Sequence, residues 1–390
     1  LATVAAATAM GQEIQSSQAA HEVPSPYQIQ QQIQQHLQQE QAHHEAQQQR
    51  GFKLTYMEES LSRGSGIASP VTTTSECELE LPLPTLSNLP LIMAAIQEAS
   101  QDNTRKSELT TAMLKPGNDK KDYLTRLLDV YNTIEDTDDD DHLKMFFVIM
   151  KTLILMNDST MLDSICSEQH ILQAIGALEN DPDAPKQTRF KHRDWISTRC
   201  RFKEIIPFND PEIVSKIHQT FRMQDIKDVV LGRVIDDGTV ATMRSLIFFN
   251  QVDIVGHIQN DDDFQTDIFS QLRESLPGSQ RRKDLLMLLQ EILSLSKNLQ
   301  PSNKISFLRE LKSRGLFDSL HQTLTDSQVP TRLATAEIMG LTLVHDPSLL
   351  RSFLVSQQPS LLMDELINRF FQDNDSGLMV LISDIFKALF

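Results

Sequence analysis

The sequence has 390 residues, of which 40% are hydrophobic and only 6% aromatic, and its formal net charge is −17 at pH 7. The apolar fraction is large enough to form a core, and the scarcity of aromatic residues and glycine favours helices over a β-sandwich. Binding of a nucleic-acid backbone requires clustered lysine and arginine, so the charge argues against nucleic acid as a direct partner. Basic protein segments suit such a surface better.

The three cysteines give no sign of a disulfide framework or of a zinc site. Cys77, Cys166 and Cys200 are far apart, and none belongs to a C-x-x-C pair. This spacing predicts a reducing compartment. The longest apolar stretch, residues 145–156, contains Lys151 and is shorter than the roughly 20 residues that a bilayer span requires, which predicts a chain without membrane spans.

Two segments of different composition precede the helical part. Residues 1–50 include the run PYQIQQQIQQHLQQEQAHHEAQQQR, whose apolar residues are too sparse for a packed face, and they are predicted to form a disordered, glutamine-rich tail. The alternative is a short helix or coiled coil through Ile29, Ile33 and Leu37, which lie four residues apart. Residues 51–88 mix glycine, serine, threonine and proline and are predicted to be a flexible linker.

From residue 89 onward the pattern is typical of helices joined by short turns. The pairs Asp210-Pro211 and Asp346-Pro347 each predict a helix start, with the carboxylate as the N-cap and the proline in the first turn. Two sets of apolar residues recur at helical spacing and predict buried helix faces. They are Leu285, Leu288, Leu289, Ile292 and Leu293 in one helix and Leu378, Ile382, Ile385 and Leu389 in another.

The clearest repeat unit is GLFDSLHQTLTDSQVPTRLATAEIMGLTLVHDPSLLRSFLV, residues 315–355. It predicts a short helix ending near Leu324, a turn, a second helix through Ile338 and a third helix that begins at Pro347. A period of about 40 residues is typical of armadillo and HEAT repeats. We therefore predict an all-α fold in which residues 89–390 form an armadillo/HEAT-like α-solenoid, preceded by the disordered tail and the linker.

Both ends of the sequence favour a longer parent protein. The chain begins without methionine, and its opening lacks the basic region of a secretion signal. It ends in LISDIFKALF, which is apolar up to Phe390, whereas the last repeat of a solenoid normally has a polar outer face. We therefore expect the helical domain to be truncated at its C-terminal end.

The sequence contains no motif for catalysis, metal binding or cofactor binding. The acidic run from Glu135 to His142 suggests an EF-hand loop, but the sixth and twelfth positions counted from Asp136 are Asp141 and Phe147 instead of glycine and glutamate. An acidic loop at the N-terminus of the next helix fits the run better. H-E-x-x-H, G-x-S-x-G, P-loop and G-x-G-x-x-G motifs are all missing. We therefore predict a non-catalytic chain without a cofactor or a metal site.

The only concentrated basic stretch is RFKHRDWISTRCRFKE, from Arg189 to Glu204, which contains the single tryptophan, Trp195. Three interpretations remain open. The stretch could form a solvated helix whose apolar edge, Trp195 and Ile196, packs on a neighbour. It could also bind an acidic partner, or an RNA strand that stacks on the aromatic ring.

Several long runs resemble, in the right order, the core domain of the phosphatase 4 regulatory subunit 3 family, also called the SMEK or falafel family. They are IMKTLILMND, GALENDPD, RFKEIIPFNDPEIVSKIHQTFRMQDIKDVVL and SLIFFNQVDIVGHIQ, and the resemblance extends over residues 79–390. Family members carry a PH-like domain of the EVH1 type before this core, which recognises short proline-containing motifs. This chain has the glutamine-rich tail and the linker at that position.

The resemblance implies a non-catalytic scaffold of the nucleus and cytoplasm. Such a scaffold binds a Ser/Thr protein phosphatase 4 catalytic subunit and a further regulatory subunit and brings them to phosphoprotein substrates, including DNA-damage-response proteins. Dephosphorylation would then take place at the metal site of the catalytic subunit. The alternative is an armadillo-type adaptor of a different complex, for which rows of tryptophan and asparagine along the inner face would be expected. A single tryptophan fits that alternative poorly.

The candidate docking region is residues 202–231, which carry the longest continuous resemblance. In the helix that begins after Asp210, the residues Ile213, Ile217 and Phe221 recur four apart and are predicted to be core. This leaves more accessible residues as the predicted partner-binding set, namely Lys216, Gln219, Arg222, Gln224, Lys227 and Asp228. The alternative is that the run only packs an insertion against the solenoid.

Overall fold

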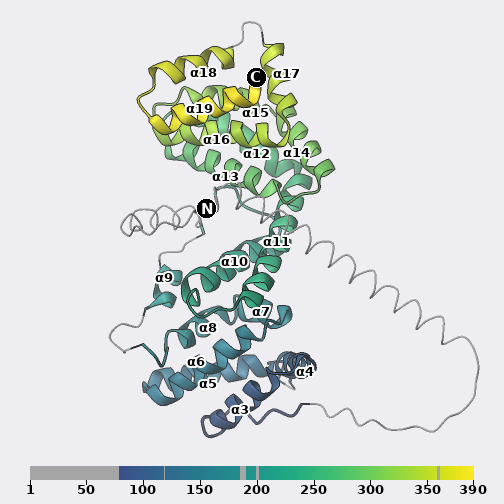
Figure 1. The fold of residues 1–390 in the computed structure, drawn as a ribbon, viewed down its shortest axis with the longest axis vertical. Coiled ribbons are helices and arrows are strands. Elements are labelled where there is room, and N and C mark those ends of the chain that lie inside the picture. Colours follow the sequence, from purple (N-terminus) through teal and green to yellow (C-terminus); the bar gives the residue numbers. More distant parts are fainter. Residues whose placement is uncertain (1–78, 118, 185–189, 199–201, 358–360) are drawn as a thin grey trace, which may run out of the picture. The chain divides into compact units, whose positions relative to one another are not determined.

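The computed structural model of the protein describes residues 79–117, 119–184, 190–198, 202–357 and 361–390. The predicted glutamine-rich tail and most of the predicted linker lie outside these ranges. Within the described ranges the chain forms helices and turns, and no β-strand is present (Figure 1). The 17 α-helices, one 3₁₀ turn and one π-helical segment of this part are, in chain order, η1 (Leu86–Asn88), α3 (Leu89–Ala99), α4 (Asn103–Leu114), α5 (Tyr123–Thr137), α6 (Asp140–Leu155), α7 (Ser159–Ile165), α8 (Ile171–Leu178), α9 (His192–Thr198), α10 (Pro211–Asp225), η3 (Ile226–Val230), α11 (Asp237–Asn260), α12 (Asp262–Glu274), α13 (Gln280–Ser296), α14 (Pro301–Ser313), α15 (Leu316–Leu324), α16 (Val329–His345), α17 (Pro347–Ser356), α18 (Leu361–Gln372) and α19 (Ser376–Leu389).

Two buried cores hold these helices together. The N-terminal core collects apolar side chains from α3 to α8 and from the first half of α11, and Tyr131 and Phe146 meet in it edge to face, with 5.4 Å between ring centroids. The C-terminal core continues from the second half of α11 to α19. Met243 and Ile247 of α11 lie in the N-terminal core, whereas Ile254 lies in the C-terminal core. This 24-residue helix therefore links the two cores.

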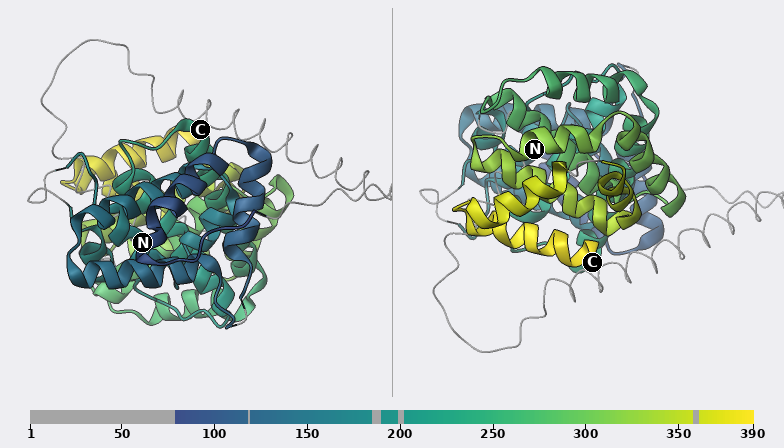
Figure 2. Two further views of the ribbon diagram at one scale, coloured as in Figure 1. Left: turned by 90° about the horizontal axis from the view of Figure 1, so that it is seen from below. Right: turned by 90° about the horizontal axis from the view of Figure 1, so that it is seen from above.

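In the C-terminal core the helices repeat in groups of three. The group α14, α15 and α16 is followed by α17, α18 and α19, and the last helices of successive groups stack on one another, α13 on α16 and α16 on α19 (Figure 1). The view from above in Figure 2 shows the yellow α19 beside the green α16. Each group thus covers the apolar face of the group before it, which is the packing of an α-solenoid. The predicted all-α solenoid fold is confirmed.

The helix pattern predicted for residues 315–355 is also confirmed. The short helix α15 is followed by a turn, by α16 and by α17, which begins at Pro347. Both predicted apolar faces are buried, the set from Leu285 to Leu293 in α13 and the set from Leu378 to Leu389 in α19. Periodicity alone therefore located these parts of the core correctly.

Aspartate carboxylates cap the starts of many of these helices. The predicted caps Asp210 and Asp346 accept hydrogen bonds from backbone N–H groups in the first turns of α10 and α17, at 2.9 and 3.0 Å. The acidic run before α6 has the same role, because Asp139 caps that helix and its carboxylate also lies 2.7 Å from Nδ1 of His142. Negative charge at this position is favourable because a helix N-terminus carries partial positive charge.

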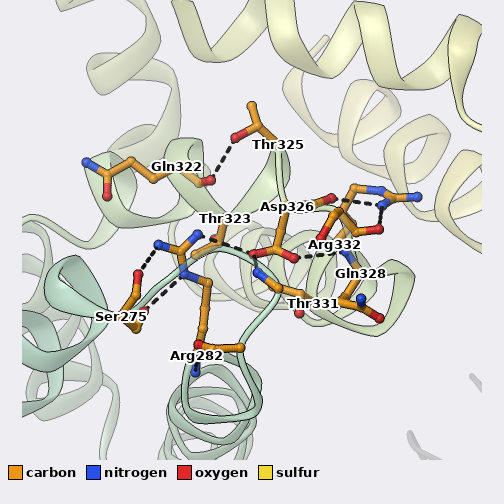
Figure 3. Close-up of polar contacts among 12 residues, drawn as sticks. Ser275, Arg282, Gln322, Thr323, Thr325, Asp326, Gln328, Thr331 and Arg332 are labelled. Atoms are coloured by element: carbon orange, nitrogen blue, oxygen red, sulfur yellow. Dashed lines mark hydrogen bonds and ion pairs between the residues drawn. The ribbon is translucent and has the colours of Figure 1, made fainter.

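A buried ion pair connects α13 to the turn after α15. Nη1 of Arg282, in the first turn of α13, lies 3.2 Å from Oδ2 of Asp326, and the two side chains are 7% and 0% exposed. The Asp326 carboxylate also accepts hydrogen bonds from the backbone N–H groups of Gly278 and Gln328, both at 2.9 Å (Figure 3). Burial by itself would raise the pKa of Asp326, but these hydrogen bonds and the guanidinium together lower it.

The same arrangement recurs one repeat later. Arg332 of α16 donates a hydrogen bond to the backbone carbonyl of Asp326 at 2.9 Å, and its Nε lies 2.7 Å from the carboxylate of Asp373, which follows α18. Arg282, Asp326, Arg332 and Asp373 therefore form a charged ladder through three successive repeats (Figure 3 shows the first three). The ladder thus joins successive repeats through buried charged groups, and Arg332 contacts both carboxylate oxygens of Asp373.

Candidate partner-binding surface

The candidate docking region folds as α10, the π-helical segment η3 and the turn that leads into α11. Asp210 caps α10, Pro211 occupies its first position, and α10 packs along α11. A π-helical turn is rare and often marks a functional or strained position. Here it coincides with the passage of the chain from the C-terminal core, which contains Ile213, to the N-terminal core, which contains Met223 and Ile226.

This passage corrects one prediction about the core face of α10. Ile213 is buried, and Ile217 is partly buried against the C-terminal core, as expected from their spacing. Phe221 was expected in the same core, but it is only partly buried and belongs to neither core. The reason is that the helix turns a different face, that of Met223, toward the N-terminal core at its C-terminal end.

Lys216 and Gln219 connect α10 to its neighbours. The Lys216 ammonium lies 2.7 Å from the carboxylate of Asp253 in α11 and 3.1 Å from that of Glu212. Its hydrogen bond with Asp253 raises the pKa of Lys216, while partial burial opposes the shift. The Gln219 side chain donates to Asp163 Oδ1 in α7 at 2.7 Å and accepts from Asn250 Nδ2 in α11 at 3.0 Å.

Gln219 therefore lies at the centre of a hydrogen-bond chain across three helices. Both of its partners escaped the sequence analysis. Asn250 lies within the matched run SLIFFNQVDIVGHIQ, but nothing in the sequence pairs it with a residue 31 positions away. Asp163 belongs to no motif that would have marked it as a partner of Gln219. Burial raises the pKa of Asp163, and the hydrogen bond from Gln219 partly offsets this effect.

The other members of the predicted set are less accessible than expected. Arg222 is half-buried and donates a hydrogen bond to the backbone carbonyl of Cys166 at 3.4 Å, and its burial lowers its pKa. Gln224 is also half-buried, and the Lys227 side chain is 13% exposed and forms an ion pair with Asp228. Of the six predicted residues, Asp228 is the one that is exposed. The six residues therefore differ in accessibility, because packing against neighbouring helices covers part of five of them, and their role in partner binding stays a prediction.

Cys166, whose carbonyl accepts this hydrogen bond, is fully buried. Burial raises the pKa of its thiol to about 12, which suppresses the thiolate that a nucleophile would need. Cys166 is therefore a packed residue of the N-terminal core. Among the described residues, no group of three side chains could hold a metal ion, and no helix is long and apolar enough to cross a membrane.

Within the basic stretch that contains Trp195, residues 192–198 form the short helix α9, whereas Arg189 and residues 199–201 lie outside the described part. Ile196 packs against the N-terminal core, while Trp195 remains 39% exposed. Arg193 holds the helix in place through a hydrogen bond of 2.9 Å to Oε2 of Glu135 in α5 and through a second ion-pair contact with the same carboxylate. The hydrogen bond from Arg193 lowers the pKa of Glu135 despite partial burial.

We expect Glu135→Gln to loosen α9 without unfolding the chain. The change removes a charge-assisted pair about two-thirds buried, and we expect a loss of about 1 kcal/mol, which corresponds to roughly fivefold faster amide hydrogen exchange in residues 192–198. Hydrogen exchange with mass spectrometry measures this directly. The control is Glu98→Gln, whose pair with Arg105 is more exposed, at 73% and 48%. Unchanged exchange in α9 of the Glu135→Gln protein would show that other contacts hold this helix.

Comparison with known proteins identifies the family. Residues 91–390 match the sequence model of the family described as phosphatase 4 regulatory subunit 3. The chain belongs to this family. A curated relative from Dictyostelium discoideum, named Suppressor of Mek1, is 40% identical over 315 residues, which cover 80% of this chain and 30% of the relative. The serine/threonine-protein phosphatase 4 regulatory subunit 3 of Drosophila melanogaster is 30% identical over 321 residues, which cover 80% of this chain and 32% of that protein.

Membership of the phosphatase 4 regulatory subunit 3 family confirms the resemblance seen in the sequence. The matched region spans about a third of the length of these two relatives. The names of the family and of the fruit-fly relative describe a regulatory subunit, in agreement with the expectation of a non-catalytic chain. The docking residues are not assigned by these comparisons and remain a prediction.

Proposed function

We propose that this chain is a non-catalytic regulatory subunit that binds a Ser/Thr protein phosphatase 4 catalytic subunit and brings it to phosphoprotein substrates. The observation that carries the proposal is the family match, which covers residues 91–390 and so includes nearly all of the described helices. A stacked helical array supports this role because it offers an extended surface on which two partners can bind at once.

The finer parts of the proposal rest on the resemblance of the sequence to the family. They are a further regulatory subunit in the complex, DNA-damage-response proteins among the substrates, and a location in the nucleus and cytoplasm. Purification of the tagged chain from cells, followed by identification of the bound proteins, tests the first two, and fluorescence microscopy of the tagged chain tests the third. Recovery of a different complex without any phosphatase would instead favour the alternative of an armadillo-type adaptor.

Within this proposal, the phosphatase docks on the surface formed by α10, η3 and the facing side of α11. Three carboxylates remain accessible there, Glu212, Asp228 and Asp253, with side chains 73%, 61% and 52% exposed, and α11 also carries the exposed Arg244. Lys216 lies between Glu212 and Asp253. Gln219 and Arg222 then have a supporting role, since they connect α10 to α7, to α11 and to the segment after α7, and Gln224 and Lys227 lie half-buried beside them.

We expect the double variant Lys216→Glu and Asp228→Lys to reduce capture of the purified catalytic subunit at least fivefold. The changes reverse two charges at this surface. Asp228 is exposed, so its reversal is expected to alter stability by about 0.5 kcal/mol or less, whereas Lys216→Glu also removes the ion pairs of a partly buried lysine with Asp253 and Glu212. A pull-down with tagged full chain and recombinant catalytic subunit measures the effect, and circular dichroism checks the fold. The matched control is the double variant Lys121→Glu and Asp129→Lys, which reverses an exposed ion pair. Lys121 precedes α5 and Asp129 lies in it, and their side chains are 51% and 52% exposed.

Capture at the wild-type level by a folded double variant would place the docking surface elsewhere. The matched run would then be structural, as in the alternative interpretation of the sequence. Failure of the wild-type chain itself to capture the phosphatase would contradict the proposed function, so the two outcomes are distinct.

A further inference from the structure

One face of α16 carries three residues whose combination is unusual for a solenoid helix. Glu337, Gly340 and Val344 are spaced by three and four residues, so they form one stripe along the helix. α16 packs between α13 and α19, and it lies far along the chain from the α10–α11 surface. Val344 is 79% exposed although it is apolar. Leu341, next to Gly340, is partly buried and packs against the C-terminal core.

Glu337 is a half-buried carboxylate without a cation. Its contact is the side-chain amide of Gln290 in α13, and no lysine, arginine or histidine of the described residues forms an ion pair with it. Burial raises the pKa of Glu337, and the hydrogen bond from Gln290 only partly offsets this. A partly desolvated, unpaired charge is unfavourable in the free protein, and such groups are concentrated at binding sites.

Gly340 lies in the interior of α16, although neither the backbone nor the packing of the helix requires a glycine there. Glycine destabilises a helix interior relative to alanine, and Gly340 has no left-handed backbone angle that would require it. A Cβ atom at this position would meet nothing within 4 Å, so close packing does not require a glycine either. Gln290 stands eight residues after the ladder arginine Arg282, and Gly340 stands eight after Arg332. Position 340 is therefore the counterpart of Gln290 in the next repeat, but it carries no side chain.

We propose that this stripe of α16 binds a lysine- or arginine-bearing segment of a substrate protein. The cationic group pairs with Glu337, the segment's backbone approaches the helix at Gly340, and an adjacent apolar side chain contacts Leu341 and Val344. Charge complementarity supports this occupant at the Glu337 end of the stripe, because Glu337 lacks an internal counter-ion, whereas Lys297 and Lys304 lie near His345 at the other end. The assignment to a substrate rests on the proposed function, in which the phosphatase occupies the α10–α11 surface and leaves α16 free.

The test uses a library of fluorescent 12-residue peptides. One arginine is fixed beside a leucine, the other positions are randomised, and a matched library replaces the arginine by neutral citrulline. Immobilised full chain is expected to retain the arginine library at least tenfold better than the citrulline library. Individual retained peptides are then titrated by fluorescence polarisation against Glu337→Gln, which keeps an acceptor for Gln290, and against Gly340→Phe, which fills the bare position. Both variants are expected to bind at least tenfold more weakly than wild type.

Gly256→Phe is the matched control for the second variant. Gly256 is also inside a helix, α11, and a Cβ there would likewise meet nothing within 4 Å. This control is expected to bind the peptides as wild type does. Gly340→Ala adds a structural check, since it should raise the thermal midpoint slightly if no packing demands the glycine.

Two results would overturn the proposal. One is equal retention of the arginine and citrulline libraries by the wild-type chain. The other is unchanged peptide binding by the Glu337→Gln protein with a wild-type thermal midpoint. Capture of the phosphatase catalytic subunit is measured on the same proteins and is expected to be unaffected by either α16 variant. Loss of peptide binding with intact phosphatase capture supports the α16 site, and failure of phosphatase capture by wild type bears on the proposed function alone.

Discussion

Asp326→Ala is expected to lower the free energy of unfolding by about 3–5 kcal/mol, the usual cost of removing one partner of a buried ion pair. Arg282 would keep its charge in a site where its side chain is 7% exposed, and the backbone N–H groups of Gly278 and Gln328 would each lose their acceptor. Urea unfolding followed by circular dichroism measures the change. We expect local hydrogen exchange to increase most in α13, α15 and α16, the helices that meet at Asp326.

The control for this prediction is Asp384→Ala. Asp384 pairs with Lys387 at 2.8 Å, but both side chains are more than 60% exposed, so the expected loss is below about 1 kcal/mol. The double variant Asp326→Leu with Arg282→Met should recover much of the stability lost in Asp326→Ala, because it removes both buried charges together. A loss for Asp326→Ala no larger than that for Asp384→Ala would contradict the importance of the ladder.

The ladder also predicts sensitivity to acid. The folded protein lowers the pKa of Asp326 and of Asp373, so the unfolded state takes up protons at a higher pH than the folded state does. The stability that these two carboxylates contribute is therefore complete above their unfolded pKa and is lost as the pH falls through the folded pKa.

Asp225→Asn is expected to stabilise the protein at pH 7.5 by about 2–3 kcal/mol, an unusual direction for a substitution in a core. Asp225 ends α10 and is 6% exposed, and its Oδ2 atom is buried without a hydrogen-bond partner. Burial raises the pKa of this carboxyl to about 6, and the charge of Asp228 adds to the effect. The folded protein at neutral pH therefore contains a charge that its surroundings disfavour.

The direction of the pH dependence follows from this raised pKa. An unfolded aspartate titrates near 3.9, so between about pH 4 and pH 6 the folded state binds the proton more tightly than the unfolded state. The contribution of Asp225 to stability is favourable below pH 4 and is lost as the pH rises toward 6. The gain from Asp225→Asn should accordingly grow from pH 4 to pH 6 and then remain constant.

Thermal unfolding of both proteins across this pH range measures the gain. Asp228→Asn is the control, since Asp228 is exposed and neutralising it should change the free energy of unfolding by about 0.5 kcal/mol or less. A constant difference between wild type and Asp225→Asn from pH 4 to pH 7.5 would show that this carboxyl titrates normally.

Much of the fold follows from local features of the sequence. The buried face of α13, the caps Asp210 and Asp346 and the order of α15, α16 and α17 were all predicted correctly. These features depend on helical periodicity and on hydrogen bonds within a few residues, which the sequence states directly. The family, too, could be recognised from consecutive runs of residues, because such runs need no knowledge of which helices touch.

The candidate sites were predictable only in part, because they depend on contacts between repeats. Spacing along α10 placed Ile213 in the core but could not show that the helix changes cores before Phe221. The partners Gln219 and Asn250 are 31 residues apart, and Arg282 and Asp326 are 44 apart. Whether such a pair forms depends on how the stacked helices are rotated and shifted against each other. That arrangement is determined by the packing of side chains from all the helices in contact.

The sequence by itself thus determined the helical class, the repeat, the helix starts and the family. The tertiary structure decided which polar residues form contacts with neighbouring helices and which remain accessible to a partner. Lys216 and Arg222 looked equally accessible on a helical wheel, yet α11 and the segment after α7 engage them. No sequence motif includes Glu337, but the stacking of α16 on α13 leaves its carboxylate half-buried and without a cationic partner. Accessibility and charge pairing are properties of the assembled surface, so they are fixed only when the helices pack.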